Sequence, residues 1–558
     1  MASVDTDLEE LMSYIGEFGK YQGFQFSLHV MSGLLAGLHM LTLVTVAAVP
    51  DHKCVVPGLR ESLGGIELTW DNVPRINQTS INGTDLTEIG ISSSNCTYKV
   101  FNEEEKPCTE WVYDPTYYKS SRAIEWNFVC SNKWKRAVAQ STYMLGVFAG
   151  AVTLGSLADK YGRKIIFCIS GTGQLVLGIL VALIPEYYSF LLVTFLYGIF
   201  GSAGAYITGF VLTMELVGPS KRTLCGILFQ LLFAVGFVVL AFWGYIIQDR
   251  MWLQIIYALH STILIGHWWY MDESPRWLWA QGRAKEAITI VQKALKMNGD
   301  NTQLDVAKFV SKNKIKRSVR QEDKSYGAVD LFKTPNLRKK CLNVCFNWFA
   351  NSIVYYGLSL SSEQLKGNPY LMLALCGLVE LPSYIFTIFT MDKLGRRCLV
   401  SSFMIIGGLC CIVAASIPES LPGTETVVTT VALFGKSCIA ISFAVIYNYT
   451  AELFPTVVRN TAIGIGSMCC RLSGALTPLL LLLDVLDPRV PATIFGLVAL
   501  ISGFTSLYLP ETVGQPMPET LEDGEKFGIG DTCFTTCLGR RDNNKDVMLD
   551  TVNDKASE

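Results

Sequence analysis

The sequence predicts an all-α membrane protein: twelve transmembrane helices in two pseudo-symmetric six-helix bundles, with a large extracellular loop. Three observations lead to this fold class. Of the 558 residues, 50% are apolar and only 17% are charged, whereas soluble domains carry about 25% charged residues. Twelve apolar runs are long enough to cross a membrane, and three motifs recur in the two halves. The apolar content excludes a disordered chain, and the net charge of −2 argues against a nucleic-acid-binding protein.

The apolar runs set the span positions, because about 20 helical residues cross about 30 Å of hydrocarbon. We expect spans near 24–49, 137–158, 165–184, 189–213, 224–247, 251–271, 342–362, 369–391, 398–417, 426–449, 460–484 and 489–509. The resulting domains are a cytosolic N-terminus (1–23), a first bundle (24–271, including an extracellular loop at 50–136), a cytosolic linker (272–341), a second bundle (342–510) and a cytosolic tail (511–558).

Charge distribution predicts the orientation in the membrane. The chain begins with an acidic segment, unlike the basic start of a signal peptide, so we expect the N-terminus to stay cytosolic. Short loops on that side carry nine Lys and Arg residues, against three in the opposite short loops. We therefore expect a multi-pass plasma-membrane protein with both termini in the cytosol.

The 50–136 loop has the features of an extracellular segment. It contains three glycosylation sequons, at Asn77, Asn82 and Asn95. It also contains four cysteines, which predict two disulfides in an oxidising compartment, with three pairings open. These cysteines are Cys54, Cys96, Cys108 and Cys130.

An internal repeat relates the two halves. The DKYGRK sequence at 159–164 matches DKLGRR at 392–397. The fourth span is followed by a glutamate and, seven residues later, an arginine (Glu215 and Arg222), and the tenth span is followed by the same pair at the same spacing (Glu452 and Arg459). A further glutamate follows the sixth span (Glu273) and the twelfth (Glu511). The offsets are 233, 237 and 238 residues, which indicates duplicated six-helix halves, as in transporters whose binding site lies between two rocking bundles.

These motifs resemble the major facilitator superfamily and, within it, solute carrier family 22. The resemblance covers almost the whole chain and rests on GSLADKYGRK (155–164), EWNFVC (125–130), ELVGPSKRT (215–223), ESPRWL (273–278) and YTAELFPTVVRN (449–460). It implies a secondary transporter of organic cations, anions or zwitterions rather than an enzyme.

The repeated charges at the span ends are a candidate cytosolic gate. Opposite charges there can pair across or within bundles when that side is closed and separate when it opens, provided that the two states differ by only a few kcal/mol. Alternatively, the basic residues only anchor the topology. The gate candidates are Asp159, Arg163, Glu215 and Arg222 in the first half and Asp392, Arg396, Glu452 and Arg459 in the second.

Three charged residues near the membrane midplane are the main substrate-binding candidates. Glu380, Lys436 and Arg471 lie about 10 residues into spans eight, ten and eleven. A midplane charge costs at least about 2.5 kcal/mol and normally faces a cavity or a partner. Their sum of +1 favours a substrate with a carboxylate, which Arg471 can bind bidentately. The alternative is a closed structural pair between Glu380 and one of the two bases.

The family resemblance sharpens this prediction. Cation carriers of the family have an acidic residue where Arg471 stands, whereas anion and carnitine-type carriers have arginine. Tyr384 occupies a position where anion exchangers have lysine and carnitine-type members have tyrosine. The segment 445–452, with Tyr447, is also similar to carnitine-type carriers.

Aromatic and polar residues complete the predicted site. Trp348 and Tyr355 are two turns apart on span seven and share a face, with Tyr356 beside them. Such rings hold quaternary ammonium groups by cation–π attraction, and Glu380 beside them could hold the cationic end of a zwitterion. By resemblance, Gln230 and Phe233 line the pocket, and His39 matches an anion-carrier position. Lipid-facing or packing aromatics, and a hydrogen-bonded packing histidine, are the alternatives.

Together these observations predict a polyspecific secondary transporter of zwitterions (carnitine-like) or organic anions. A potential-driven organic cation facilitator is the alternative, and a non-transporting receptor on the same fold is a minor one. We expect a small organic ion and membrane lipid as partners, without nucleic acid, ATP, metal or cofactor. Gly435-Lys436-Ser437 lacks the earlier glycine of a P-loop. Coupling to Na⁺ or to a counter-transported organic ion stays open.

Overall fold

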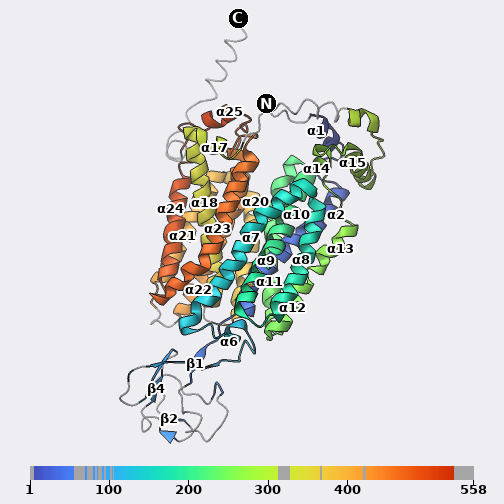
Figure 1. Ribbon diagram of the computed structural model, residues 1–558. Coiled ribbons are helices and arrows are strands. Elements are labelled where there is room, and N and C mark those ends of the chain that lie inside the picture. Colours follow the sequence, from blue (N-terminus) through green and yellow to red (C-terminus); the bar gives the residue numbers. More distant parts are fainter. Residues whose placement is uncertain are drawn as a thin grey trace.

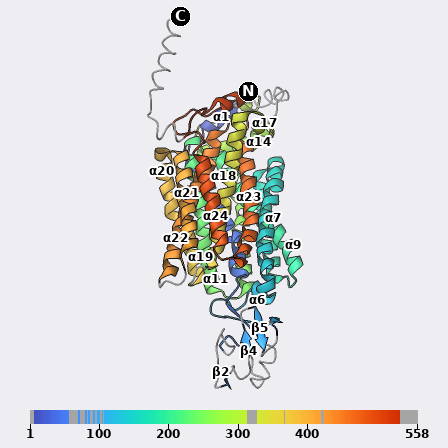
Figure 2. The ribbon, with the colours of Figure 1, turned by 90° about the vertical axis from the view of Figure 1, so that its left-hand side faces the viewer.

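The structure is a computed structural model that describes residues 6–55, 69–71, 80–81, 84–85, 91–93, 96–100, 104, 106–311, 327–364, 367–418 and 423–532. Two helical bundles stand side by side (Figure 1). The strands lie at one end, hereafter the strand end, and the short helices α1 and α25 lie at the other, hereafter the terminal end. Figure 2 shows the same two ends after a quarter turn, with the strands at one and α1 at the other.

The first bundle contains six helical segments, three of them interrupted. Span four passes through a π-helical stretch, Ile199–Ala205, which lies between two α-helices. Span six breaks at His260 and Ser261. The elements are α2 (Lys20–Met40) with α3 (Thr42–Val46), α7 (Lys133–Tyr161), α8 (Arg163–Leu183), α9 (Tyr187–Gly198) with α10 (Tyr206–Leu216), α11 (Pro219–Ile246), and α12 (Arg250–Leu259) with α13 (Thr262–Gly266) and η3 (His267–Trp269).

The second bundle repeats this arrangement. Three of its helices have proline in the first turn, where its fixed φ is suitable. Asn368 caps α19 by accepting from the Tyr370 and Leu371 amides. The elements are α18 (Pro335–Leu360), α19 (Pro369–Leu378) with α20 (Glu380–Leu394), α21 (Arg396–Ser416), α22 (Thr424–Leu453), α23 (Arg459–Leu481) with η6 (Leu482–Val485), and α24 (Val490–Ser506).

All twelve predicted spans are therefore helical over most of their length. Among the described residues, nine are long and apolar enough to cross a membrane by length and composition alone. The sixth is broken, the seventh begins with Arg338, Lys339 and Lys340, and the twelfth has only 17 residues. Of these three, only the seventh is largely buried, whereas the sixth and the twelfth expose large apolar side chains such as Trp252 and Phe504.

Short helices cover the terminal end. They are α1 (Thr6–Ser13), α14 (Pro275–Ala280), α15 (Ala284–Asn298), α17 (Asp330–Lys333) and α25 (Leu521–Lys526). The N-terminal segment packs on the linker through Leu11, Ile15, Ile288 and Val291, all buried. An ion pair of 2.6 Å joins Glu9 to Arg276. The N-terminus and the linker thus form one small core against the first bundle.

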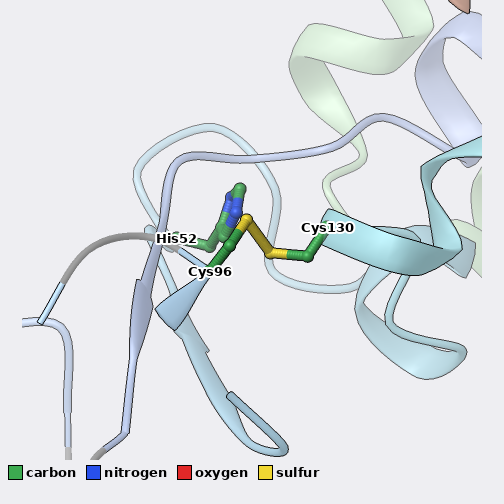
Figure 3. Close-up of side chains that lie close together, drawn as sticks. All are labelled: His52, Cys96 and Cys130. Atoms are coloured by element: carbon green, nitrogen blue, oxygen red, sulfur yellow. A yellow bond between two sulfur atoms is a disulfide. The ribbon is translucent and has the colours of Figure 1, made fainter. Parts of the chain in front are cut away.

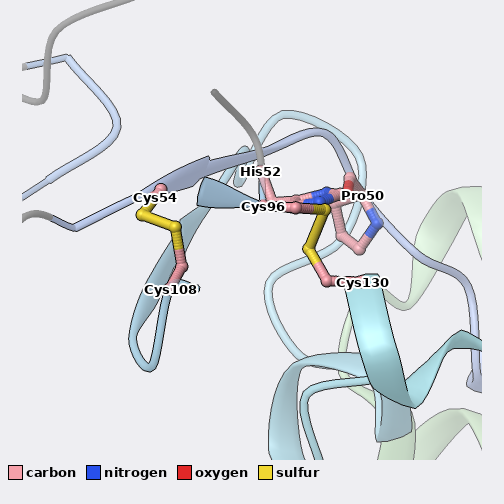
Figure 4. Close-up of a disulfide and its surroundings, with 6 residues drawn as sticks. All are labelled: Pro50, His52, Cys54, Cys96, Cys108 and Cys130. Atoms are coloured by element: carbon pink, nitrogen blue, oxygen red, sulfur yellow. A yellow bond between two sulfur atoms is a disulfide. The ribbon is translucent and has the colours of Figure 1, made fainter. Parts of the chain in front are cut away.

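The loop at the strand end adds antiparallel strands and one short helix. The elements are β1 (His52–Cys54) paired with β7 (Trp111–Tyr113), β2 (Ser80–Ile81) with β3 (Thr84–Asp85), the sheet β4 (Ile91–Ser93), β5 (Thr97–Val100) and β6 (Lys106–Pro107), the helix α6 (Arg122–Glu125) and the turn η1 (Cys130–Asn132). The four predicted cysteines form two disulfides, Cys54–Cys108 and Cys96–Cys130 (Figure 4). The sequons at Asn77, Asn82 and Asn95 lie outside the described residues.

Candidate functional site

Two of the three midplane charges form a closed ion pair in the second bundle. Lys436 Nζ on α22 lies 3.0 Å from Glu380 Oε1 on α20, and the two side chains are 1% and 0% exposed. Tyr355 and Tyr384 each donate a hydrogen bond of 2.9 Å to Glu380 Oε2. Lys436 also donates to the Ser359 hydroxyl. The structure thus brings four predicted site residues together, but as a sealed cluster.

The third midplane charge, Arg471 on α23, is placed differently. Its side chain is half-buried and donates to the Ser467 carbonyl at 2.9 Å and to the Ser467 hydroxyl. Within the part of the chain that the structure describes, no carboxylate pairs with this guanidinium. Its electrostatic neighbours are the hydroxyls of Tyr206, Tyr356 and Tyr447. Since a guanidinium has five N–H donors, most remain for a ligand.

Aromatic rings connect the region of Arg471 to the ion pair. The Trp348 ring centroid lies 4.3 Å from that of Tyr447, and Trp348 Nε1 donates to Thr450 Oγ1 at 3.0 Å. Phe443 stacks on Tyr355 with centroids 5.7 Å apart. Trp348 and Tyr355 therefore share a face of α18, as their spacing predicts, and both rings are almost fully buried.

The first bundle contributes the opposite side of this aromatic cluster. Phe210 on α10 approaches Tyr447 across the bundles at 6.3 Å, and Tyr206 packs on Phe233 at 6.2 Å. Gln230 has a buried Oε1 with no hydrogen-bond partner among the described residues. Tyr206 and Phe210 were not among the site residues expected from the sequence. Their spacing of four residues gave the available signal, because it places both on one face of a helix.

His39 lies away from this cluster. It is fully buried in the first bundle, and its ring nitrogens meet Tyr197 Oη at 2.5 Å and Ser261 Oγ at 3.3 Å. Both nitrogens are thus used within the bundle, which corresponds to the packing alternative.

The gate candidates form two equivalent clusters at the terminal end. Arg163 pairs with Asp159 at 2.9 Å and with Glu215 at 3.1 Å. In the second bundle, Arg396 pairs with Asp392 at 2.8 Å and with Glu452 at 2.9 Å. All four distances join residues of the same bundle.

The remaining gate arginines also occupy equivalent positions. Arg222 donates to the Val217 carbonyl at 3.2 Å, and Arg459 donates to the Phe454 carbonyl at 3.4 Å, each five residues back in the chain. Each arginine thereby joins the first turn of its helix to the backbone segment that follows the gate glutamate.

The repeated glutamates Glu273 and Glu511 have a structural role that the sequence motif alone did not define. The Glu273 carboxylate accepts from the amides of Arg163 and Lys164 at the start of α8. Glu511 accepts equivalently from two amides at the start of α21. Burial raises the pKa of the Glu273 carboxyl, and the backbone hydrogen bonds oppose that shift. Both carboxylates thus satisfy N–H groups that a helix N-terminus leaves unpaired.

The two bundles meet at the strand end. An ion pair of 2.6 Å joins Lys133 at the start of α7 to Asp484 on η6, and Tyr370 donates to the Tyr117 carbonyl at 2.8 Å. Nearer the midplane, a Cβ added at Gly474 on α23 would lie 3.8 Å from Met144 Sδ on α7.

Towards the terminal end, the same two helices carry glycines with open space beside them. A Cβ added at Gly155 on α7 or at Gly464 on α23 would meet no atom within 4 Å. Among the described residues, the ion pairs of the gate candidates at the terminal end lie within each bundle, whereas the Lys133–Asp484 pair at the strand end joins the two bundles.

A histidine and two cysteines at the strand end lie within 4.8 Å of one another: His52, Cys96 and Cys130 (Figure 3). Their grouping resembles a metal-ligand set. The two sulfurs are joined in a disulfide, so they offer no thiolate ligands, and the His52 ring simply packs beside that bond.

Comparison with known proteins gives the context for this geometry. A family model described as "Sugar (and other) transporter" matches residues 91–523. The organic cation transporter protein of Drosophila melanogaster is 35% identical over 93% of this chain and 95% of its own length. Solute carrier family 22 member 16 of Xenopus laevis is 32% identical (93% and 94%), and member 3 of Mus musculus is 33% identical (93% and 96%).

Solved structures share the fold at low sequence identity. The inward open xylose transporter XylE of E. coli superposes with a TM-score of 0.58 at 16% identity, covering 90% of this chain and 98% of XylE. The human organic anion transporter MFSD10 gives a TM-score of 0.52 at 13% identity, covering 87% and 99%. The fold is therefore that of a twelve-helix major facilitator transporter, as the sequence predicts.

Proposed function

This chain belongs to the sugar (and other) transporter family and, within it, to solute carrier family 22 of organic ion transporters, and on that premise we propose that it carries small organic zwitterions or monovalent organic anions. It is a multi-pass membrane protein and not an enzyme. We place it in the plasma membrane, with the terminal end in the cytosol, where the nine Lys and Arg residues of the short loops lie.

The proposal that the substrate has a carboxylate rests on one observation: Arg471 is separate from the other two midplane charges. Glu380 and Lys436 neutralise each other at 3.0 Å inside the second bundle. Among the described residues, no carboxylate compensates the +1 that Arg471 contributes at the level of the aromatic cluster. An unpaired charge in a membrane interior is costly, and a ligand carboxylate held by two N–H groups offsets that cost.

The cationic end of a zwitterion is assigned to the aromatic rings. Since Glu380 is sealed behind Tyr355, its carboxylate is not open to a ligand. The half-buried rings of Phe210, Phe233 and Tyr447 remain available, and each cation–π contact contributes about 0.5–2 kcal/mol. Because these rings come from both bundles, a ligand between them would contact both halves.

Alternating access would use the two rigid gate clusters. Each cluster ties three helices of one bundle together through one arginine, so that each bundle moves as a unit. Opening the strand end requires breaking the Lys133–Asp484 pair, while the terminal end closes by approach of α7 and α23. The differences between such states amount to a few kcal/mol, within the range of a few exposed ion pairs.

The test is uptake by transfected cells of labelled carnitine, p-aminohippurate and tetraethylammonium, with and without sodium, at matched surface expression. Arg471→Ala should lower carnitine or p-aminohippurate uptake about 10- to 100-fold, the effect of removing a charged, bidentate contact. Arg489→Ala, which removes an exposed arginine at the strand end, is the control. Uptake of tetraethylammonium alone by the wild type would refute the polarity, and uptake of none of the three would favour a receptor.

An organic cation facilitator is the second candidate, because relatives named as organic cation transporters are 35% identical to this chain. In that case Arg471 would repel the substrate. Arg471→Asp should then raise tetraethylammonium uptake, whereas under the first proposal it abolishes carnitine uptake without such a gain.

A further inference from the structure

A cavity of about 1020 Å³ lies at the strand end, outside the aromatic cluster. Its walls come from the loop, from the start of α7 in the first bundle and from η6 in the second. The two disulfides stand beside it, with Cys96, Cys108 and Cys130 among the lining residues (Figure 4). It occupies the position that an ion coming from the strand end reaches first.

Charged residues of both signs line this cavity. Lys133, Arg136 and Gln140 follow one face of α7 at helical spacing. The acidic residues are Asp51, Asp114 and Asp484. Burial lowers the pKa of His52 below its usual value, so this imidazole adds no charge near pH 7. The ionised groups of the lining therefore sum to −1, a sign opposite to that of the Arg471 region.

Two buried acceptors in the lining have no hydrogen-bond partner among the described residues. One is Asp484 Oδ1, whose sister oxygen is paired with Lys133 at 2.6 Å. The other is Oε1 of Gln140, a residue only 4% exposed whose amide nitrogen donates to the Met40 carbonyl. A buried acceptor without a donor is costly. An ammonium group with N–H donors satisfies both the charge and the hydrogen-bonding capacity.

We propose that this outer cavity is a binding site for the protonated amine of an incoming organic ion, held by Asp484 and Gln140. A carboxylate on the same ligand would meet Lys133. The ligand's ammonium group then takes the place of Lys133 beside Asp484, and its carboxylate takes the place of Asp484 beside Lys133. Binding here therefore breaks the ion pair that joins the bundles and loosens the closure of the strand end. The inference rests on the proposed function in taking this ligand to be the transported ion.

The test measures ligand-induced thermal stabilisation of the purified full chain in nanodiscs, with ethanolamine and choline as a matched pair. Ethanolamine carries N–H donors on its cation, and choline does not. In the wild type we expect ethanolamine to half-saturate the rise in melting temperature at about tenfold lower concentration than choline. Asp484→Asn and Gln140→Leu should each remove this preference.

Controls separate binding from structural damage. Asp487→Asn makes the same charge change at an exposed residue outside the cavity lining and should preserve the preference. Lys133→Gln breaks the ion pair but keeps Asp484, so ethanolamine should bind as well as in wild type or better. If the pair has a purely structural role, ethanolamine binding should weaken in both Asp484→Asn and Lys133→Gln. That result would overturn the inference.

The central site is tested separately. Arg471→Ala, which the proposed function expects to lose uptake, should still bind ethanolamine. Loss of ethanolamine binding there would place the amine in the central site and also overturn the inference. Equal binding of ethanolamine and choline to the wild type would do the same. None of these outcomes depends on which ion is transported, so failure of the proposed function is recognised independently in the uptake assay.

Discussion

Glu380→Gln is the sharpest test of the sealed ion pair. Glutamine keeps the shape and can still accept from the Tyr355 and Tyr384 hydroxyls, but it removes the charge opposite Lys436. The ammonium would then be buried without a counter-ion, at 1% exposure. We expect strong destabilisation, although the change only replaces one carboxylate oxygen by an amide NH₂ group.

The magnitude follows from the geometry. At the 3.0 Å separation of Glu380 and Lys436, two unit charges attract by about 5.5 kcal/mol at an effective dielectric constant of 20. Breaking a buried pair on one side costs about 3–5 kcal/mol, because it leaves an uncompensated charge. Replacing both residues removes that charge, so Glu380→Gln combined with Lys436→Gln should recover most of the loss.

The assay is thermal unfolding of the four proteins of this double-mutant cycle in detergent, together with uptake. A structural pair predicts two unstable single variants and a more stable double variant that still transports. If the double variant is stable but inactive, Lys436 or Glu380 contacts substrate. If Glu380→Gln melts at the wild-type temperature, the reasoning is refuted.

Two further predictions concern the terminal end. Gly162, between α7 and α8, has φ +113°, and a Cβ there would lie 2.5 Å from Glu273 Oε2, so Gly162→Ala should destabilise the protein by about 1–3 kcal/mol. Gly155→Ala, inside α7 with open space beside it, should be neutral or stabilising in the same melting assay. Glu525 accepts from two amides at the start of α18, so Glu525→Ala should lower the free energy of unfolding by about 1–2 kcal/mol. Glu522→Ala removes only an exposed ion pair and should lower it by less than about 0.5 kcal/mol. Equal melting temperatures within either pair would contradict the corresponding contact.

The positions of the spans could be predicted from sequence because they depend on one strong constraint, the length of apolar chain that crosses the bilayer. The interruptions could not. The π-helical stretch at Ile199–Ala205 and the break at His260 and Ser261 depend on packing with neighbouring helices, which leaves no mark in an apolar run. Some helices also begin several residues before the expected span, as α18 does at Pro335 and α7 at Lys133, because their polar first turns extend beyond the apolar run.

The candidate site was predictable in its residue types but not in its pairing. Spacing along helices identified Glu380, Lys436 and Arg471 as midplane charges. Which base pairs with the glutamate depends on how α20, α22 and α23 rotate, and periodicity within one helix does not contain that information. The disulfide pairing was open for the same reason, since it depends on contacts between strands far apart in sequence.

The internal repeat separates the scaffold from the substrate site. Gate residues occur in both halves with nearly identical pair distances. The midplane charges do not recur: at the repeat offset of 233 residues Glu380 corresponds to Val147, and at the offset of 237 residues Lys436 and Arg471 correspond to Ile199 and Ala234. Duplicated charges thus join the helices within each bundle, whereas the midplane charges belong to the second half only. Under the proposed function, the Arg471 guanidinium on the second bundle binds the carboxylate of a zwitterion, and aromatic rings of the first bundle such as Phe210 and Phe233 bind its cationic end.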